Sequence, residues 1–221
     1  MRAVRRLPMQ LFITGTDTDA GKTYVTALLL DAMRQRGMRA AGFKPFCCGT
    51  REDAATLLQA GADGLTLDAI NPVWLKTPAS PFAAALIENR TVDMDAVKEA
   101  LVALKLQVDH VLVEGVGGWE VPLRVGLTAA DFAQELALPV IVVVNNRLGA
   151  LNHTLLTVRN IESRGMRCLG VVLNYAAPGR DAASISNGMI LARMGVTVLG
   201  EVMHGETDGR ELLDTLLATC P

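Results

Sequence analysis

Residues 11–23 have the sequence LFITGTDTDAGKT, in which a short apolar run leads into a loop bounded by two glycines. The run 11–14 is typical of a buried strand, and helical spacing of apolar residues begins after Gly21. Glycines let backbone N–H groups close around phosphate oxygens, and a helix that starts there adds its dipole. Lys22 supplies a cation, and Thr23 supplies a hydroxyl that can ligate Mg²⁺. The stretch therefore predicts a nucleotide-binding P-loop at the end of a strand.

This loop is a variant of the common phosphate-binding pattern. Gly15 and Gly21 are six positions apart, one more than in GxxxxGK[ST], which would place its first glycine at Thr16. A chance Gly-Lys-Thr at a helix start is the alternative. Because strand, loop and helix follow one another in the expected order, we favour nucleotide binding.

The rest of the chain alternates between β-branched runs and longer helical patterns. Strands are predicted at residues 10–15, 40–45, 110–114, 140–145, 169–174 and 196–202. Helices are predicted at residues 22–36, 94–106, 129–135, 150–163 and 184–194. Several strands are apolar at consecutive positions, which indicates burial on both faces. We therefore predict an α/β fold, a P-loop NTPase-like and mostly parallel sheet with helices on both faces, in a single domain over residues 1–221.

The composition argues against several classes of function. The formal net charge is −2, and the 21 Lys and Arg residues are scattered rather than gathered into a stripe, so no nucleic-acid partner is expected. The longest apolar run, 138–144, is far shorter than the roughly 20 residues that span a bilayer, so no membrane is expected. The four cysteines lack metal-ligand spacing, which fits a reducing cytoplasm.

Charged residues stand where such sheets bind ligands, beyond the carboxyl ends of the strands. Glu114 follows an apolar strand and precedes a glycine-rich segment, so it is a candidate Mg²⁺ ligand; the alternative is a carboxylate that caps a nearby turn. Lys44 ends the second strand and would point to the same edge as the P-loop; the alternative is an exposed strand-end lysine. Asp53 lies near the start of a helical pattern, where it fits Mg²⁺ coordination and an N-terminal cap equally well.

Three further features carry polar or reactive side chains. Asn174 follows a strand and could give a donor and an acceptor to the edge of an adenine ring, or form a turn. Residues 148–153, LGALNH, open a helical pattern whose N-terminus could hold a carboxylate. Cys47 and Cys48 are adjacent and have no base nearby in the sequence, so inert buried thiols are predicted rather than a redox pair.

The chain resembles the dethiobiotin synthetase family in five segments: GTDTDAGKT at 15–23, Lys44-Pro45 followed by Gly49, EGVGG at 114–118, LGALNH at 148–153, and Asn174. The resemblance extends from the first predicted strand to the last. It implies a reaction of 7,8-diaminononanoate with CO₂ and ATP that gives dethiobiotin, ADP and phosphate in biotin biosynthesis. One amine forms a carbamate, the γ-phosphate transfers to the carbamate oxygen, and the second amine attacks this mixed anhydride to close a cyclic urea.

The resemblance also implies roles for individual residues. Lys22 and Lys44 are the catalytic cations, and Thr23, Asp53 and Glu114 hold Mg²⁺. The implied nucleotide-binding residues are Asp19, Ala20, Gly21, Lys22, Thr23, Tyr24, Glu114, Gly115, Val116, Gly117 and Asn174. The implied substrate-binding residues are Thr16, Lys44, Cys48, Gly149 and Asn152. Because the family is dimeric and the neighbouring subunit contributes the segment from Gly149 to Asn152, a homodimer with its substrate site at the interface is expected.

The sequence departs from the family at two places. Cys48 stands where the family usually has a serine that contacts substrate, and a thiol donates a weaker hydrogen bond. Residues 203–206, Met-His-Gly-Glu, replace a proline-containing loop that lies against the base and a glutamate at the ribose.

Three other interpretations fit the P-loop. Partition and cell-division ATPases carry a lysine at the position of Asp17, so an acidic residue there argues against them. Cobyrinate-type amidoligases need an amidotransferase domain that 221 residues are too few to supply. A nucleotide switch would bind ATP without a turnover that depends on the diamine.

Overall fold

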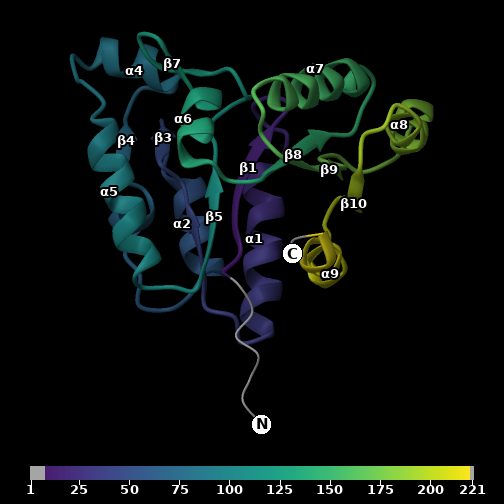
Figure 1. Cartoon of the computed structure of the whole chain (residues 1–221), viewed down its shortest axis with the longest axis horizontal. Coiled ribbons are helices and arrows are strands. Elements are labelled where there is room, and N and C mark those ends of the chain that lie inside the picture. The colour runs from purple at the N-terminus through teal and green to yellow at the C-terminus, as the bar shows by residue number, and fades with distance from the viewer. Residues whose placement is uncertain (1–7, 220–221) are drawn as a thin grey trace.

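The computed structural model describes residues 8–219; the basic residues Arg2, Arg5 and Arg6 and the cysteine Cys220 lie outside this range. Its centre is a six-stranded sheet in the order β10-β9-β8-β1-β5-β2, in which every neighbouring pair is parallel (Figure 1). Its strands are β1 (Gln10–Gly15), β2 (Ala40–Phe43), β5 (His110–Glu114), β8 (Val140–Asn145), β9 (Cys168–Asn174) and β10 (Val198–Val202). All six predicted strands are confirmed, and the bounds of β1, β5 and β8 agree to the residue.

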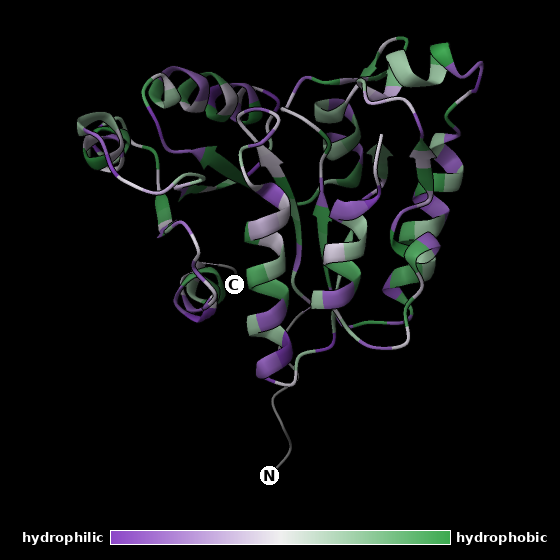
Figure 2. Ribbon diagram, turned by 180° about the vertical axis from the view of Figure 1, so that it is seen from behind, coloured by the Kyte–Doolittle hydropathy of each residue, from purple (hydrophilic) through white to green (hydrophobic). Residues whose placement is uncertain are grey.

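Helices cover both faces of this sheet. On the face turned toward the viewer in Figure 2, α1 (Lys22–Gln35) packs beside α2 (Glu52–Ala60). On the opposite face lie α6 (Ala129–Leu136) and α7 (Ala150–Ser163) (Figure 1). The other helices are α3 (Leu67–Ile70), α4 (Pro81–Ile87), α5 (Met94–Lys105), α8 (Ala182–Arg193) and α9 (Arg210–Thr219). All five predicted helices are confirmed, with ends within about two residues, which is the usual uncertainty of helix bounds.

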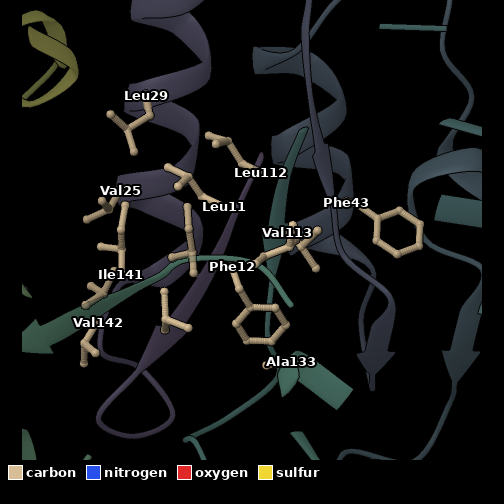
Figure 3. Close-up of a cluster of buried hydrophobic side chains, with 14 of the residues drawn as sticks. Leu11, Phe12, Val25, Leu29, Phe43, Leu112, Val113, Ala133, Ile141 and Val142 are labelled. Carbon is tan, nitrogen blue, oxygen red and sulfur yellow. The ribbon is translucent and has the colours of Figure 1, made fainter. Parts of the chain in front are cut away.

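The side chains of β1 show why this sheet is buried on both faces. Leu11 and Phe12 are each 1% exposed, although neighbouring side chains of a strand point to opposite faces. In Figure 3, Leu11 and Leu112 lie beside Leu29 of α1, whereas the Phe12 ring lies beside Ala133 of α6. Burying such a side chain stabilises the fold by roughly 1.5–3 kcal/mol relative to leaving it exposed. The two apolar layers therefore fix β1, and with it the start of the loop that follows.

Several shorter elements were not predicted. Between β2 and α5 the chain forms α2, where a helical pattern was expected near Asp53, and the unpredicted α3, α4, β3 (Phe46–Cys48) and β4 (Val73–Leu75); β3 and β4 pair in parallel. The antiparallel hairpin of β6 (Pro122–Arg124) and β7 (Leu127–Thr128) precedes α6, and α9 packs against α1. Most of these elements are too short for apolar periodicity to reveal them. Among residues 8–219, no helix combines the length and apolarity needed to cross a membrane.

Candidate active site

The loop between β1 and α1 lies at the edge of the sheet where the carboxyl ends of the parallel strands meet (Figure 1). The Thr16 N–H donates to the Val143 carbonyl at 3.0 Å, so pairing with β8 continues one residue beyond Gly15. Asp19 and Gly21 then adopt positive φ angles of 58° and 89°, which turn the chain into α1.

Asn174 supports this loop from the end of β9. Its side chain is buried, and its Nδ2 donates to the Ala20 carbonyl at 3.0 Å. A Cβ atom at Gly21 would lie 2.0 Å from the same Nδ2, so only glycine leaves room for the asparagine. The Asn174 Oδ1 is buried without a hydrogen-bond partner among the described residues. The turn-forming interpretation of Asn174 is therefore wrong, while its contact with adenine stays a prediction.

Lys22 and Thr23 open α1 at the base of the loop. Lys22 is 6% exposed, and its Nζ donates to the Asp17 carbonyl at 3.0 Å. Burial, and next the nearby Lys44 ammonium, lower the pKa of Lys22 to about 8. No side chain caps α1, so the N–H groups of its first turn are available to an anion.

Lys44 lies in a buried cluster of charges. Its side chain is 3% exposed, and its Nζ lies 2.6 Å from Glu114 Oε1 and 2.9 Å from Asp53 Oδ2. Glu114 Oε1 also accepts a hydrogen bond from Thr23 Oγ1 at 2.7 Å. Burial disfavours the charged ammonium, but the carboxylates of Glu114 and Asp53 outweigh burial and raise the pKa of Lys44. The interpretation of Lys44 as an exposed strand-end lysine is therefore wrong.

The two carboxylates are held by this cluster rather than by caps. Helix α2 begins at Glu52 after Arg51, without a side-chain cap, and the Asp53 carboxylate instead pairs with Lys44. Burial opposes ionisation of Asp53, but the Lys44 ammonium lowers its pKa below the usual value. Glu114 is the last residue of β5 and accepts from Lys44 and Thr23, so it caps no turn through these contacts. The capping alternatives for Asp53 and Glu114 are both wrong.

Thr23, Asp53 and Glu114 form an oxygen set that fits Mg²⁺. Glu114 is fully buried, and its Oε2 has no hydrogen-bond partner among the described residues. A buried polar atom without a partner is costly, and a cation beside it would remove this cost. Mg²⁺ is usually bound by one or two carboxylates together with substrate phosphates. Within residues 8–219, no three His, Cys, Asp or Glu side chains gather as a metal site, so the Thr23 hydroxyl and phosphate oxygens would have to complete the coordination.

A cavity of about 590 Å³ opens over these groups. The predicted site residues that line it are Asp19, Gly21, Lys22, Thr23, Tyr24, Lys44, Cys48, Asp53, Val116 and Gly117. Ala20, Glu114, Gly115 and Asn174 are buried behind it, and Thr16 lies in the loop outside its lining. The lining residues that were not predicted as site residues are Thr18, Phe46, Cys47, Thr50, Pro78, Ala79, Ser80 and Val121. Ser80 caps α4, and Pro81 occupies its first turn, so this Ser-Pro helix start was a signal that could have been used.

The helix start from Gly149 to Asn152 does not reach this cavity within one chain. Gly149 precedes α7 with a φ of 91° and no side-chain cap, and both Gly149 and Asn152 are exposed. Neither residue lines the cavity. The contact of Gly149 and Asn152 with the substrate therefore stays a prediction.

The segment 203–206 and the two cysteines also lie near the site. The Tyr24 hydroxyl donates to the Glu206 carbonyl, which brings this segment to the first turn of α1. Burial raises the pKa of the Cys48 thiol to about 11 and also raises the pKa of Cys47. Protonated thiols are poor nucleophiles, in keeping with the absence of a predicted redox role.

A glycine-bounded loop that joins a central parallel strand to a helix beginning with Lys and Thr defines a P-loop nucleotide-binding protein. The sequence model of a family described as an AAA domain matches residues 9–207. The ATP-dependent dethiobiotin synthetase BioD of Akkermansia muciniphila is 46% identical, over 88% of this chain and 92% of its own. Its counterpart in Aromatoleum aromaticum is 41% identical, over 89% and 91%. The chain belongs to the ATP-dependent dethiobiotin synthetase family.

Solved structures share the fold at lower identity. Cobyrinic acid a,c-diamide synthase from Mycobacterium smegmatis aligns with a TM-score of 0.56 and 14% identity, over 95% of this chain and 92% of its own. The cell division ATPase MinD of Pyrococcus furiosus aligns with a TM-score of 0.56 and 17% identity, over 96% and 98%. These similarities confirm the predicted P-loop NTPase-like fold.

Proposed function

We propose that the protein is an ATP- and Mg²⁺-dependent cyclo-ligase that converts 7,8-diaminononanoate and CO₂ to dethiobiotin, working as a single domain over residues 1–221. The names of its relatives support the reaction. The observation that carries the chemistry is the placement of Lys22, the first residue of α1, and Lys44, which directly follows β2, on the wall of one cavity. Two ammonium groups beside a P-loop suit a reaction in which a carboxylate-like group receives a phosphoryl group.

The reaction develops negative charge on the carbamate and on the transferring phosphoryl group, and the two lysines would neutralise this charge. One amine attacks CO₂ and loses a proton to give a carbamate, whose oxygen attacks the γ-phosphorus while the bond to ADP breaks. The second amine then attacks the carbamate carbon, and phosphate leaves as the ring closes. Lys44, whose pKa is raised by its carboxylate neighbours, stays charged and neutralises the carbamate. Lys22 and the N–H groups of α1 hold the transferring phosphoryl group.

The remaining site residues follow from this arrangement. Thr23, Asp53 and Glu114 would hold Mg²⁺, which would supply positive charge beside the phosphates of ATP. Val116 and Gly117 line the same cavity as Lys22 and Thr23, where they would flank the phosphates. Under this proposal Tyr24 and Asn174 serve the base, and Thr16 and Cys48 serve the diamine.

Phosphate release from Mg-ATP with bicarbonate, with and without 7,8-diaminononanoate, tests the function when dethiobiotin is confirmed by mass. We expect release that depends on the diamine, and its loss in Lys44→Ala. Lys98→Ala is the matched control, because Lys98 is an exposed lysine of α5 that pairs with Asp95 and Glu135. ATP binding without diamine-dependent release would instead support a nucleotide switch.

The proposal includes a homodimer in which Gly149 and Asn152 of one copy complete the diamine site of the other. It is supported by the exposure of both residues and by their absence from the cavity lining of their own chain. Mixing inactive Lys44→Ala chains with inactive Asn152→Ala chains would then restore about a quarter of the wild-type rate, since half of the dimers would contain one intact site of two. If both residues serve the site of their own chain, mixing restores nothing.

A further inference from the structure

The backbone of Lys44 is held by a segment more than twenty residues further along the chain. The Lys44 N–H donates to the Ile70 carbonyl at 2.8 Å, and the Lys44 carbonyl accepts from Asn71 Nδ2 at 2.7 Å. Asn71 is 2% exposed, and its Nδ2 also donates to the Val73 carbonyl at 3.1 Å. Both backbone polar groups of Lys44 are therefore satisfied where the chain leaves β2.

Arg51 in turn holds Asn71. Its Nε donates to Asn71 Oδ1 at 2.9 Å, and its Nη2 donates to the Asn71 carbonyl at 3.0 Å. The guanidinium lies over the Trp74 ring, 5.4 Å from its centroid, and Trp74 Nε1 donates to the Gly49 carbonyl at 2.8 Å. A planar guanidinium can make both bonds and stack on the ring at once, so the asparagine has little freedom to move.

The same arginine stands at the start of the helix that carries Asp53. Arg51 is the residue before α2, and Asp53, two positions later, pairs with the Lys44 ammonium at 2.9 Å. Lys44 is thus held at its backbone through Asn71 and at its ammonium through Asp53. Arg51 is common to both, because it binds Asn71 and directly precedes the helix that carries Asp53.

We propose that Asn71 and Arg51 are positioning residues that hold the Lys44 ammonium in the catalytic cavity. Neither residue lines that cavity, so both act through Lys44 rather than on substrate. Displacing a catalytic group by about 1 Å can cost a hundredfold in rate, which gives such support a measurable effect. This inference rests on the function proposed above for Lys44.

Asn71→Asp tests the contact to the Lys44 carbonyl. The aspartate keeps the shape of the side chain and an acceptor for Arg51, but it replaces the Nδ2 donor with an oxygen that faces the carbonyl oxygen. We expect kcat per active site to fall about 10–100-fold while KM for ATP changes less than about twofold, because Lys22 and Thr23 stay in place. A purely structural asparagine would lower the amount of folded protein and leave kcat per active site unchanged. Active sites are counted by titration with a non-hydrolysable ATP analogue.

Arg51→Lys tests the hydrogen bonds from Arg51 to Asn71, and it remains informative if Asn71→Asp fails to fold. A lysine keeps the charge but cannot donate to both Asn71 oxygens in one plane. We expect kcat to fall about 3–10-fold, and the double variant to be little slower than Asn71→Asp alone, because the two residues act in series.

His110→Leu and Lys44→Ala are the controls. His110 Nδ1 accepts from the buried Met9 N–H at 2.9 Å at the amino end of β5, so His110→Leu removes a comparable buried bond far from the cavity and should leave kcat unchanged. If Asn71→Asp and Arg51→Lys retain wild-type kcat while Lys44→Ala is inactive, the positioning role is refuted and the proposed function stands. An equal loss of kcat in His110→Leu would also refute it. A fully active Lys44→Ala would overturn the proposed role of Lys44 and this inference with it.

Discussion

Helices α1 and α7 begin in the same way but in different surroundings. Each has 14 residues and follows a glycine with positive φ, 89° at Gly21 and 91° at Gly149, and neither has a side-chain cap. The start of α1 consists of Lys22 and Thr23, borders the cavity and lies beside Glu114, whereas Gly149 and Asn152 at the start of α7 are exposed. A helix dipole and a start without a side-chain cap are therefore common to both, although the Ala150 N–H of α7 donates to the Arg147 carbonyl. The surrounding charges distinguish the two starts. An uncapped glycine start becomes a phosphate site only where cations and carboxylates are placed around it.

Gly21→Ala should give the largest effect and break the α1 site. The new Cβ would meet Asn174 Nδ2 at 2.0 Å, and the positive φ adds backbone strain. We expect the free energy of unfolding to fall by about 2–5 kcal/mol and the affinity for Mg-ATP to be lost. Urea denaturation and calorimetric titration with a non-hydrolysable ATP analogue would measure the two changes.

Asn174→Ala added to Gly21→Ala separates the two causes of that loss. It removes the atom that the new Cβ meets and leaves the backbone strain, so part of the stability should return. Wild-type ATP affinity in Gly21→Ala alone would contradict the account of this loop.

Raising the pH should weaken ATP binding at α1, because Lys22 is the charged group there that titrates in an accessible range. Burial and the Lys44 ammonium lower its pKa to about 8. The charged form is present below this pKa and is lost above it, so the affinity of the free protein for the ATP analogue should fall about tenfold per pH unit above pH 8. The analogue is measured without diamine, whose own amines titrate.

Lys22→Arg is the control for this pH dependence. A guanidinium stays protonated throughout the range, so its binding, even if weaker at pH 7, should stay level as the pH rises. A level profile in the wild type up to about pH 9.5 would mean that Lys22 keeps its proton in the free protein.

The sequence could predict those site residues whose position follows from their neighbours in the chain. Gly21, Lys22 and Thr23 are adjacent in the chain, and their order after an apolar strand predicts their position and chemistry. Lys44 and Glu114 were predicted because each follows a buried strand whose end must lie at the same edge. Such local signals also predicted the six strands and five of the helices.

Residues whose roles arise only from distant contacts were beyond this reasoning. Asn174 supports the P-loop from 154 positions away, and no local pattern predicts a bond to the Ala20 carbonyl. Asn71 and Arg51 lie in the segment 50–81, where short elements leave no periodicity to interpret. For Asn174 the residue type indicated a polar contact, but only the fold identifies the Ala20 carbonyl as its partner.

Gly149→Ala should give the smallest effect and shows what the same substitution costs at the exposed helix start. Nothing lies within 4 Å of a Cβ at this position, so only the strain of a positive φ remains. We expect the free energy of unfolding to fall by about 1–2 kcal/mol with ATP affinity unchanged, measured by the same denaturation and titration as for Gly21→Ala. If Gly149→Ala instead costs as much as Gly21→Ala, the proposed dimer packs a second copy closely enough against Gly149 to meet the methyl group, since its own chain offers nothing within 4 Å. The difference in unfolding free energy between Gly21→Ala and Gly149→Ala therefore measures how closely each chain packs around its own helix start.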